Sequence, residues 1–176
     1  EKVALQVADQ MTDYPMKGAV TNALNMAPVS AEEAPILRPY MTLGGLLGGF
    51  LGQVPADGIT AVVIELDGKS AALNPEPIVA ATLAGLFGPV MESVNMVNAA
   101  AVASSNGIAV STIRHERQCD YETLLRVTVS HKDGERTIAG TLVGGNKPRI
   151  VEVQHIAIES GFPPYLLYLR NYDKPG

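Results

Sequence analysis

Runs of apolar and β-branched residues closed by turn signals are the clearest pattern along this chain. Residues 59–66, ITAVVIEL, end at Asp67-Gly68, which predicts a strand followed by a tight turn. Lys132-Asp-Gly-Glu135 stands between two later runs of this kind and predicts a hairpin, because Asp-Gly supplies the positive φ that such turns require. The pattern predicts further strands over residues 108–116, 123–131, 136–144 and 149–159, the last half-buried and interrupted at His155.

Helical spacing with start and stop signals predicts three helices between residues 30 and 107. Ser30-Ala-Glu-Glu33 has the form of a capping box, so a helix begins near Ala31 and is bent or restarted at Pro39. A second helix begins after a capping Asn74 and ends at Gly88-Pro89. A short third helix, AAAVASS, follows Asn98 as its cap and ends at Asn106-Gly107.

The first of these helices is unusually rich in glycine. LGGLLGGFLG, residues 43–52, holds five glycines, and each costs up to about 1 kcal/mol relative to alanine inside a helix. Close packing against another helix or the sheet is the expected compensation. A phosphate-binding loop is disfavoured, because neither a lysine nor a strand-then-turn pattern accompanies these glycines.

The order of elements is a helix, a strand, two helices and then an antiparallel meander. It predicts an α+β fold, a mostly antiparallel sheet with helices packed on one face. Before this body, Val3, Val7 and Met11 recur at helical spacing without a cap. After it, residues 165–169 are predicted to form a strand that enters an Asp-Lys-Pro-Gly turn. Both ends are therefore expected to be interior cuts of a longer polypeptide.

Composition narrows the classes of partner and compartment. The chain has 176 residues and a net charge of −5, so nucleic acid is not expected as the main partner. The most apolar stretch, residues 41–54, is shorter than the ~20 residues that a membrane-spanning helix needs. No signal peptide is expected at the start. With Cys119 as the one cysteine, no internal disulfide can form, and a reducing compartment, the cytoplasm, is the default expectation.

The residues that usually carry catalysis form no recognisable constellation in the sequence. His115, His131 and His155 lack the spacing of metal ligands, and no CxxC, GxSxG or GxGxxG motif is present. His115 and Cys119 lie among charged residues, which solvation explains better than a nucleophile and its base. No catalytic residue and no metal site is therefore predicted.

One segment has the features of an anion site. Gly144 and Gly145 can turn backbone amides outward, while Lys147 and Arg149 add positive charge and a guanidinium fork suited to phosphate or carboxylate. The competing interpretation is a solvated hairpin turn, since glycine, asparagine and lysine occur in turns for conformational reasons alone.

Five ordered segments together resemble the long-form D-3-phosphoglycerate dehydrogenases. The segments are ALQVADQM, AVTNALNM, VNMVNAAAVASSNGI, GTLVGGNKPRIVEV and RNYDKPG. The resemblance implies that residues 1–27 end a substrate-binding domain and residues 28–160 form an intervening, allosteric substrate-binding domain. Residues 161–176 would then form the first strand of an ACT domain.

The resemblance also implies specific roles for residues. Asn171 and Asp173 fall at effector positions of an ACT domain, in a pocket whose remainder is absent here. Arg149 falls at an anion-binding position, but Ile156 and Gly161 stand where the family has arginines, so phosphate or phosphoglycerate is an expected but weakened effector.

For the whole protein, the resemblance implies an NAD-dependent enzyme whose catalytic residues and nucleotide site lie outside this chain. The chain alone is expected to be inactive and to hold no cofactor. Its expected partners are the catalytic domains and the ACT domain of a homo-oligomer. Two alternatives stay open: the related domain of an iron–sulfur L-serine dehydratase, and a stand-alone anion-binding module.

Overall fold

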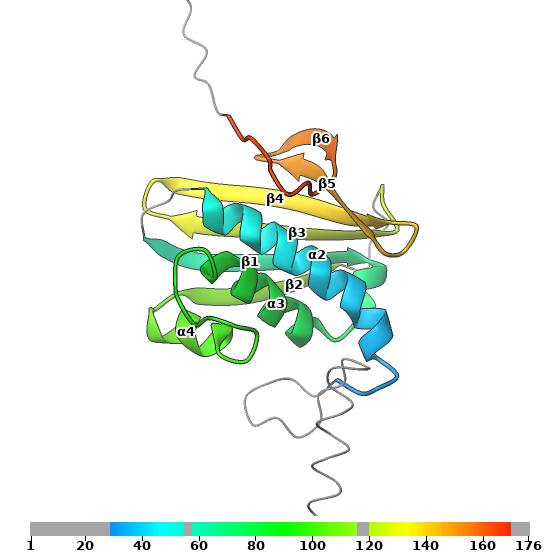
Figure 1. Cartoon of the computed structure of the whole chain (residues 1–176), viewed down its shortest axis with the longest axis horizontal. Coiled ribbons are helices and arrows are strands. Elements are labelled where there is room, and N and C mark those ends of the chain that lie inside the picture. The colour runs from blue at the N-terminus through cyan, green and yellow to red at the C-terminus, as the bar shows by residue number, and fades with distance from the viewer. Residues whose placement is uncertain (1–28, 55–57, 116–119, 170–176) are drawn as a thin grey trace, which may run out of the picture.

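The computed structural model describes residues 29–54, 58–115 and 120–169. Two longer helices lie side by side on one face of a six-stranded sheet (Figure 1). The helices are α2 (Ala34–Gln53), α3 (Pro75–Phe87) and α4 (Ala99–Ser105), with a short 3-10 helix η1 (Lys69–Ala72). The strands are β1 (Ile59–Gly68), β2 (Ala109–His115), β3 (Thr123–His131), β4 (Gly134–Val143), β5 (Lys147–Val153) and β6 (Ile156–Ser160).

The sheet has the strand order β2-β1-β3-β4-β5-β6, and the β1–β2 pair is its one parallel pair among the described residues. The α+β class with helices on one face is confirmed. The predicted meander is wrong for β2, which pairs with β1 at the edge and not with β3. The physical reason is that α3 and α4 lie between β1 and β2, and a crossover of this length brings the second strand back parallel to the first.

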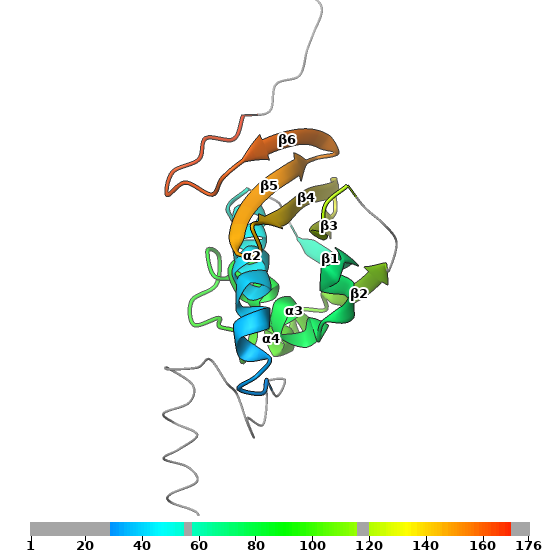
Figure 2. The same cartoon turned by 90° about the vertical axis from the view of Figure 1, so that its right-hand side faces the viewer.

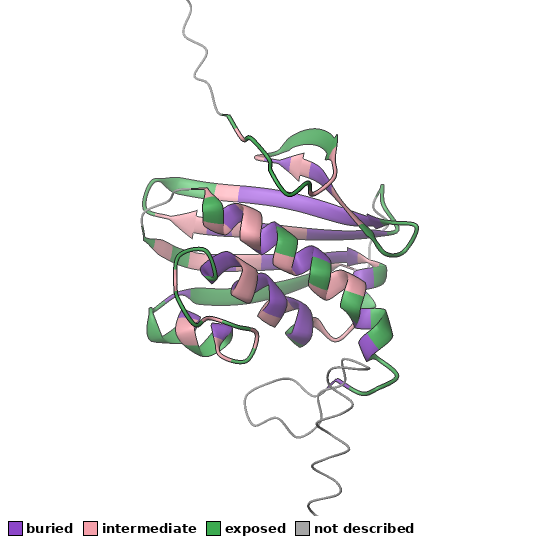
Figure 3. Ribbon diagram, viewed as in Figure 1, coloured by how far each residue is buried: buried purple, intermediate pink, exposed green. Residues whose placement is uncertain are grey.

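The core lies between the helices and the middle of the sheet. Leu43 and Leu47 of α2 and Ile64, Val127 and Ile138 of β1, β3 and β4 are all fully buried. Burial of one such side chain contributes roughly 1.5–3 kcal/mol relative to leaving it in water. Figure 3 shows buried positions along α2, α3 and the central strands, while β2 is exposed.

Local capping signals lie at the starts of the two longer helices, although α2 begins at Ala34, three residues after the predicted start near Ala31. The Ser30 hydroxyl accepts a hydrogen bond from the Glu33 amide at 3.2 Å, and the Glu33 carboxylate accepts one from the Ser30 amide at 3.2 Å. The capping box is therefore formed, and α2 continues through Pro39 without a break. At α3, the Asn74 side chain accepts a hydrogen bond from the Glu76 amide at 3.2 Å, as expected for a cap.

Asn98 precedes α4 but does not cap it through its side chain. Its side-chain oxygen accepts from the Asn95 amide at 2.8 Å, and its amide group donates to the Ser93 carbonyl at 2.9 Å. The predicted cap is thus wrong in detail, because Asn98 stabilises the preceding loop instead. The stop at Asn106-Gly107 is confirmed, since Gly107 has φ of 68°.

The segment predicted as one strand over residues 149–159 forms two strands. Gln154 and His155 have φ of 51° and 62°, so the chain reverses there and β6 pairs antiparallel with β5. A two-residue turn with positive φ at both positions normally contains Asn-Gly. Because this turn contains Gln-His instead, the sequence indicated only an interruption of one strand. The Asp133-Gly134 hairpin between β3 and β4 is confirmed.

Beyond β6 the chain lies against the C-terminal half of α2 without joining the sheet. The strand predicted for residues 165–169 is not present, because this segment pairs with no strand in the described part of the chain. It is held instead by Tyr168, whose ring meets Phe50 edge-on with centroids 5.6 Å apart.

Residues 1–27 lie outside the described ranges. Among the described residues, no helix has both the length and the apolar character to cross a membrane.

Candidate functional site

The predicted anion site lies on the tight turn that joins β4 to β5. Val143 and Lys147 pair at the base of this turn, and Gly144 and Gly145 between them have φ of 61° and 81°. A Cβ atom added at either glycine would meet no atom within 4 Å. The glycines are therefore required by backbone conformation and not by crowding, and the turn is open to solvent.

Lys147 and Arg149 are two positions apart on β5, so their side chains leave the same face of the strand. Lys147 is exposed, while Arg149 is half-buried and donates from Nη1 to the Pro148 carbonyl at 3.1 Å. A Cβ atom at Gly161 would lie 3.5 Å from the same nitrogen. Arg149 thus reaches across to the segment that follows β6.

The proximity of Arg149 to Gly161 concerns the two positions, 156 and 161, where the resembled family has arginines. Gly161 is beside Arg149, so an arginine at position 161 would add its charge there. Ile156 is at the opposite end of β6, paired with Val153, and is exposed. The structure therefore brings together Arg149 and position 161 but leaves position 156 apart.

The turn can attract a small anion through the charges of Lys147 and Arg149. Neither Lys147 nor Arg149 forms an ion pair within the described ranges, so both charges are available. Because the turn is exposed to water, each charge contributes little on its own. Phosphate or carboxylate is the class of ligand that fits this pair of cations.

The helix-free face of the sheet carries a row of charged residues that the sequence analysis missed. Arg126 donates from Nη2 to the Glu152 carboxylate at 3.0 Å, and its Nη1 lies 3.9 Å from the Glu65 carboxylate. His115 lies 3.5 Å from Glu65, and His155 lies 3.5 Å from Glu152. Each carboxylate thus has two basic neighbours, which is the arrangement of a structural ion network.

Strand register explains how this row forms. Glu65 pairs with Arg126 across β1 and β3, and Ala139 of β4 lies between Arg126 and Glu152. Because Ala139 is small and buried, the guanidinium and the carboxylate meet above it. Polar residues at the non-core positions of each strand were visible in the sequence, but their alignment depends on the strand order. Figure 2 shows this face of the sheet without a helix.

The remaining predicted residues fall in different places. Asn171, Asp173 and Cys119 lie outside the described residues. His131 ends β3 and turns into a cavity on the helix side of the sheet. No three potential ligand side chains among the described residues come together as a metal site.

These features define a two-layer α+β domain with a cationic glycine turn at one end of its sheet. The family model described as the D-3-phosphoglycerate dehydrogenase intervening domain matches residues 36–154 of the chain. The chain therefore belongs to this family of intervening domains.

Three relatives, all named D-3-phosphoglycerate dehydrogenase, match 99% of this chain. The protein of Synechocystis sp. is 31% identical, that of Archaeoglobus fulgidus 30% and that of Bacillus subtilis 27%. The chain spans only 32% to 33% of their lengths. These matches favour the dehydrogenase resemblance over the serine dehydratase alternative.

Proposed function

We propose that this chain is the regulatory intervening domain of an NAD-dependent D-3-phosphoglycerate dehydrogenase. That enzyme oxidises 3-phosphoglycerate to 3-phosphohydroxypyruvate in the first step of serine synthesis. The observation that carries the proposal is the family match over residues 36–154, together with the shared name of the relatives. The catalytic residues and the NAD site belong to the rest of the whole protein.

The proposed role of the domain is to couple effector binding to catalysis. A phosphate-bearing effector such as phosphoglycerate binds at the β4–β5 turn through Lys147, Arg149 and the backbone amides of Gly144 and Gly145. The exposed position of the turn and the two available cations support this assignment. A coupling free energy of about 1–3 kcal/mol between this turn and the catalytic domains is enough for regulation.

The proposed partners are the catalytic domains and an ACT domain of the same polypeptide, within a cytoplasmic homo-oligomer. Exposed apolar side chains after β6 support a neighbouring domain on that side. Tyr165, Leu167 and Leu169 are 94%, 82% and 78% exposed, which is costly for apolar groups unless another surface covers them. Asn171 and Asp173 would belong to the serine site of that ACT domain.

Deletion of the intervening domain from the whole enzyme tests the regulatory role. NADH formation from NAD and 3-phosphoglycerate is expected to continue after deletion of residues 36–154, while the response to phosphoglycerate and phosphate is lost. The 176-residue chain alone is expected to form no NADH above the blank. An unchanged effector response after deletion, or turnover by this chain alone, would overturn the proposal.

The anion site is tested by following thermal unfolding of this chain during titration with phosphate and with 3-phosphoglycerate. A ligand at one hundred times its Kd adds about 2.7 kcal/mol of stability. Lys147→Gln combined with Arg149→Gln should remove the stabilisation. Lys132→Gln, at an exposed position at the other end of β4, is the single-charge control and should retain it. Absence of stabilisation at millimolar ligand would remove the site.

A further inference from the structure

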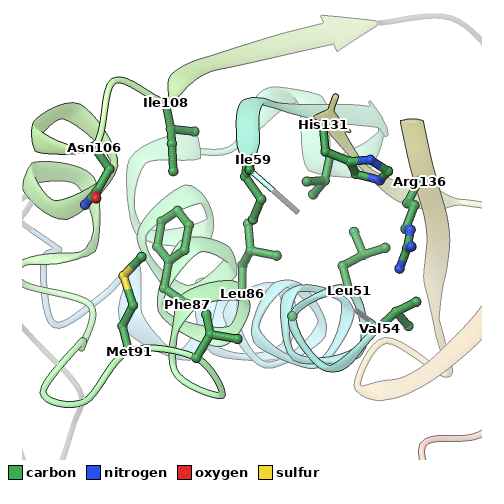
Figure 4. A pocket seen from close by; sticks show the side chains of 14 residues that line it. Leu51, Val54, Ile59, Leu86, Phe87, Met91, Asn106, Ile108, His131 and Arg136 are labelled. Carbon is green, nitrogen blue, oxygen red and sulfur yellow. The ribbon is translucent and has the colours of Figure 1, made fainter. Parts of the chain in front are cut away.

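A cavity of about 480 Å³ opens at the end of the sheet where α2 and α3 terminate. This volume lies within the roughly 300–1,000 Å³ that small-molecule pockets usually have. Most of its wall is apolar, as Figure 4 shows. The apolar part is formed chiefly by Leu51, Ile59, Leu86, Phe87, Met91 and Ile108.

Two basic side chains enter this cavity from neighbouring strands. Arg136 of β4 pairs with Val129 of β3, and His131 is two residues beyond Val129 on the same face of β3. Both side chains therefore turn toward the helices. In Figure 4 they lie together on one wall, across the cavity from Phe87 and Met91.

Three polar atoms of this wall have no partner within the part of the chain that the structure describes. Nη1 of Arg136 and both ring nitrogens of His131 are buried and form no hydrogen bond. Roughly 90% or more of buried polar groups in folded proteins are paired. A buried group left unpaired is destabilising, because it has lost its hydrogen bonds to water. Three such atoms at one wall of a cavity indicate a ligand that supplies acceptors.

The acidic side chains nearest in sequence do not neutralise Arg136. Glu135 accepts a hydrogen bond from the Ser130 hydroxyl at 3.0 Å, on the helix-free face of the sheet, and Asp133 is exposed in the hairpin turn. Arg126 provides the contrast, because it lies on that opposite face and has Glu152 at 3.0 Å. Arg136 forms no ion pair among the described residues.

The helix arrangement explains why a charged Arg136 is tolerated without a counterion. Gly44 faces Ile78 and Thr82 while Gly52 faces Leu86, so α2 and α3 run parallel and end at the same side. The C-terminal end of each helix carries partial negative charge, which favours a nearby cation. This field stabilises the guanidinium while leaving Nη1 available as a donor.

We propose that this cavity binds a small organic carboxylate with an apolar body. The planar carboxylate accepts hydrogen bonds from the guanidinium fork of Arg136, and His131 lies beside it as a further polar contact. The apolar body lies against Phe87, Ile59 and Ile108. The site is distinct from the β4–β5 turn, which is at the other end of β4.

The carboxylate claim is tested on the wild-type chain by NMR with two probes of nearly equal shape. Phenylacetate should cause saturable shifts in the signals of Ile59, Ile108 and Phe87. Phenylacetamide has the same apolar body without the charge and should bind at least tenfold more weakly. Equal affinity of the two probes, or saturation of phenylacetate elsewhere with these signals unmoved, would overturn the proposal.

Two charge-matched variants then locate the cation. Arg136→Gln should lower phenylacetate affinity at least tenfold, whereas Arg38→Gln, at an exposed position in the N-terminal part of α2, should leave it within twofold. Unchanged affinity in Arg136→Gln would also overturn the proposal. Should Arg136→Gln not fold, Arg136→Lys keeps the charge but lacks the bidentate fork, so its affinity should still fall measurably below that of the wild type. Phosphate binding at Lys147 and Arg149 is a separate readout, so failure of either site is distinguishable from failure of the other.

Discussion

Gly48 of α2 lies directly against the carbonyl oxygen of Thr82 in α3, with no space between them for a Cβ atom. The same relationship holds between Gly52 and the Leu86 carbonyl, and between Gly85 and the Gly45 carbonyl. The two helices thus pack backbone against backbone. This close approach is what offsets the conformational cost of so many glycines within α2.

Gly48→Ala is therefore expected to destabilise the domain. The added methyl group would force α2 and α3 apart, and overpacking of this kind typically costs about 1–3 kcal/mol or more. Urea unfolding followed by circular dichroism measures the change. Gly49→Ala is the matched control, because its Cβ would meet only the Gly85 carbonyl at 3.9 Å. It should be neutral or gain up to about 1 kcal/mol from helix propensity. Equal effects at both positions would contradict backbone-to-backbone packing.

Arg126→Met is expected to destabilise the sheet, because Glu65 and Glu152 would then lose the cation between them. Breaking a partly buried ion pair by removing one partner costs less than the ~3–5 kcal/mol of a fully buried pair. A double-mutant cycle with Glu152→Gln gives the coupling energy. The double variant should recover part of the stability lost in Arg126→Met. A coupling energy of zero would show that the row of charges makes no joint contribution.

Lys69 and Glu122 form an exposed pair whose Nζ and Oε2 atoms are 2.8 Å apart. The pKa of Glu122 is lowered chiefly by its hydrogen bond to Lys69 and further by the positive charge of Lys69. The pKa of Lys69 is raised by the same hydrogen bond and by the negative charge of Glu122. The contribution of Glu122 is present above its unfolded pKa of about 4.3 and is lost as pH falls through the lower folded pKa. That of Lys69 is present below its unfolded pKa of about 10.4 and is lost as pH rises through the higher folded pKa.

Lys69→Met should therefore raise the pKa of Glu122 toward its ordinary value. A carboxyl-carbon NMR titration of Glu122 measures this directly. In the unmodified protein, 1 M salt should shrink the shift, because exposed charges are screened. A pKa of Glu122 that stays the same in Lys69→Met would show that another group lowers it.

The turn between β5 and β6 offers a stabilising substitution. Gln154 and His155 both have positive φ, which costs an ordinary residue roughly 1–2 kcal/mol. Gln154→Asn with His155→Gly supplies the residues that a two-residue hairpin turn favours. The double variant should raise the midpoint of thermal unfolding. His155→Ala alone is the control for loss of the imidazole near Glu152, and it should not stabilise.

The features that the sequence predicted are those carried by near neighbours in the chain. The capping box at Ser30 and Glu33, the cap at Asn74 and the Asp133-Gly134 turn each involve atoms within three residues of one another. Their energetics depend little on distant parts of the molecule. The Gln154-His155 reversal was missed because its backbone conformation is imposed by the pairing of β5 with β6 and not by its residue types.

The candidate sites also differ in whether residues close together in the sequence are enough to reveal them. The turn from Gly144 to Arg149 is a single continuous segment, so its glycines and cations could be recognised together. Arg136 and His131 are near in sequence as well, but their significance depends on the cavity beneath the ends of α2 and α3. The pairing of Arg126 with Glu152 likewise needed the register of three strands.

Local signals in the amino-acid order were sufficient to predict the helices, most of the strands, the α+β class and the resemblance to an intervening domain, because periodicity, caps and short motifs are local properties. The tertiary structure alone decided that β2 returns parallel beside β1, and that α2 contacts α3 through glycine. It also decided which charges are paired and which enter a cavity unpaired. These features depend on long-range packing, where burial and strand order fix the neighbours that local signals cannot specify.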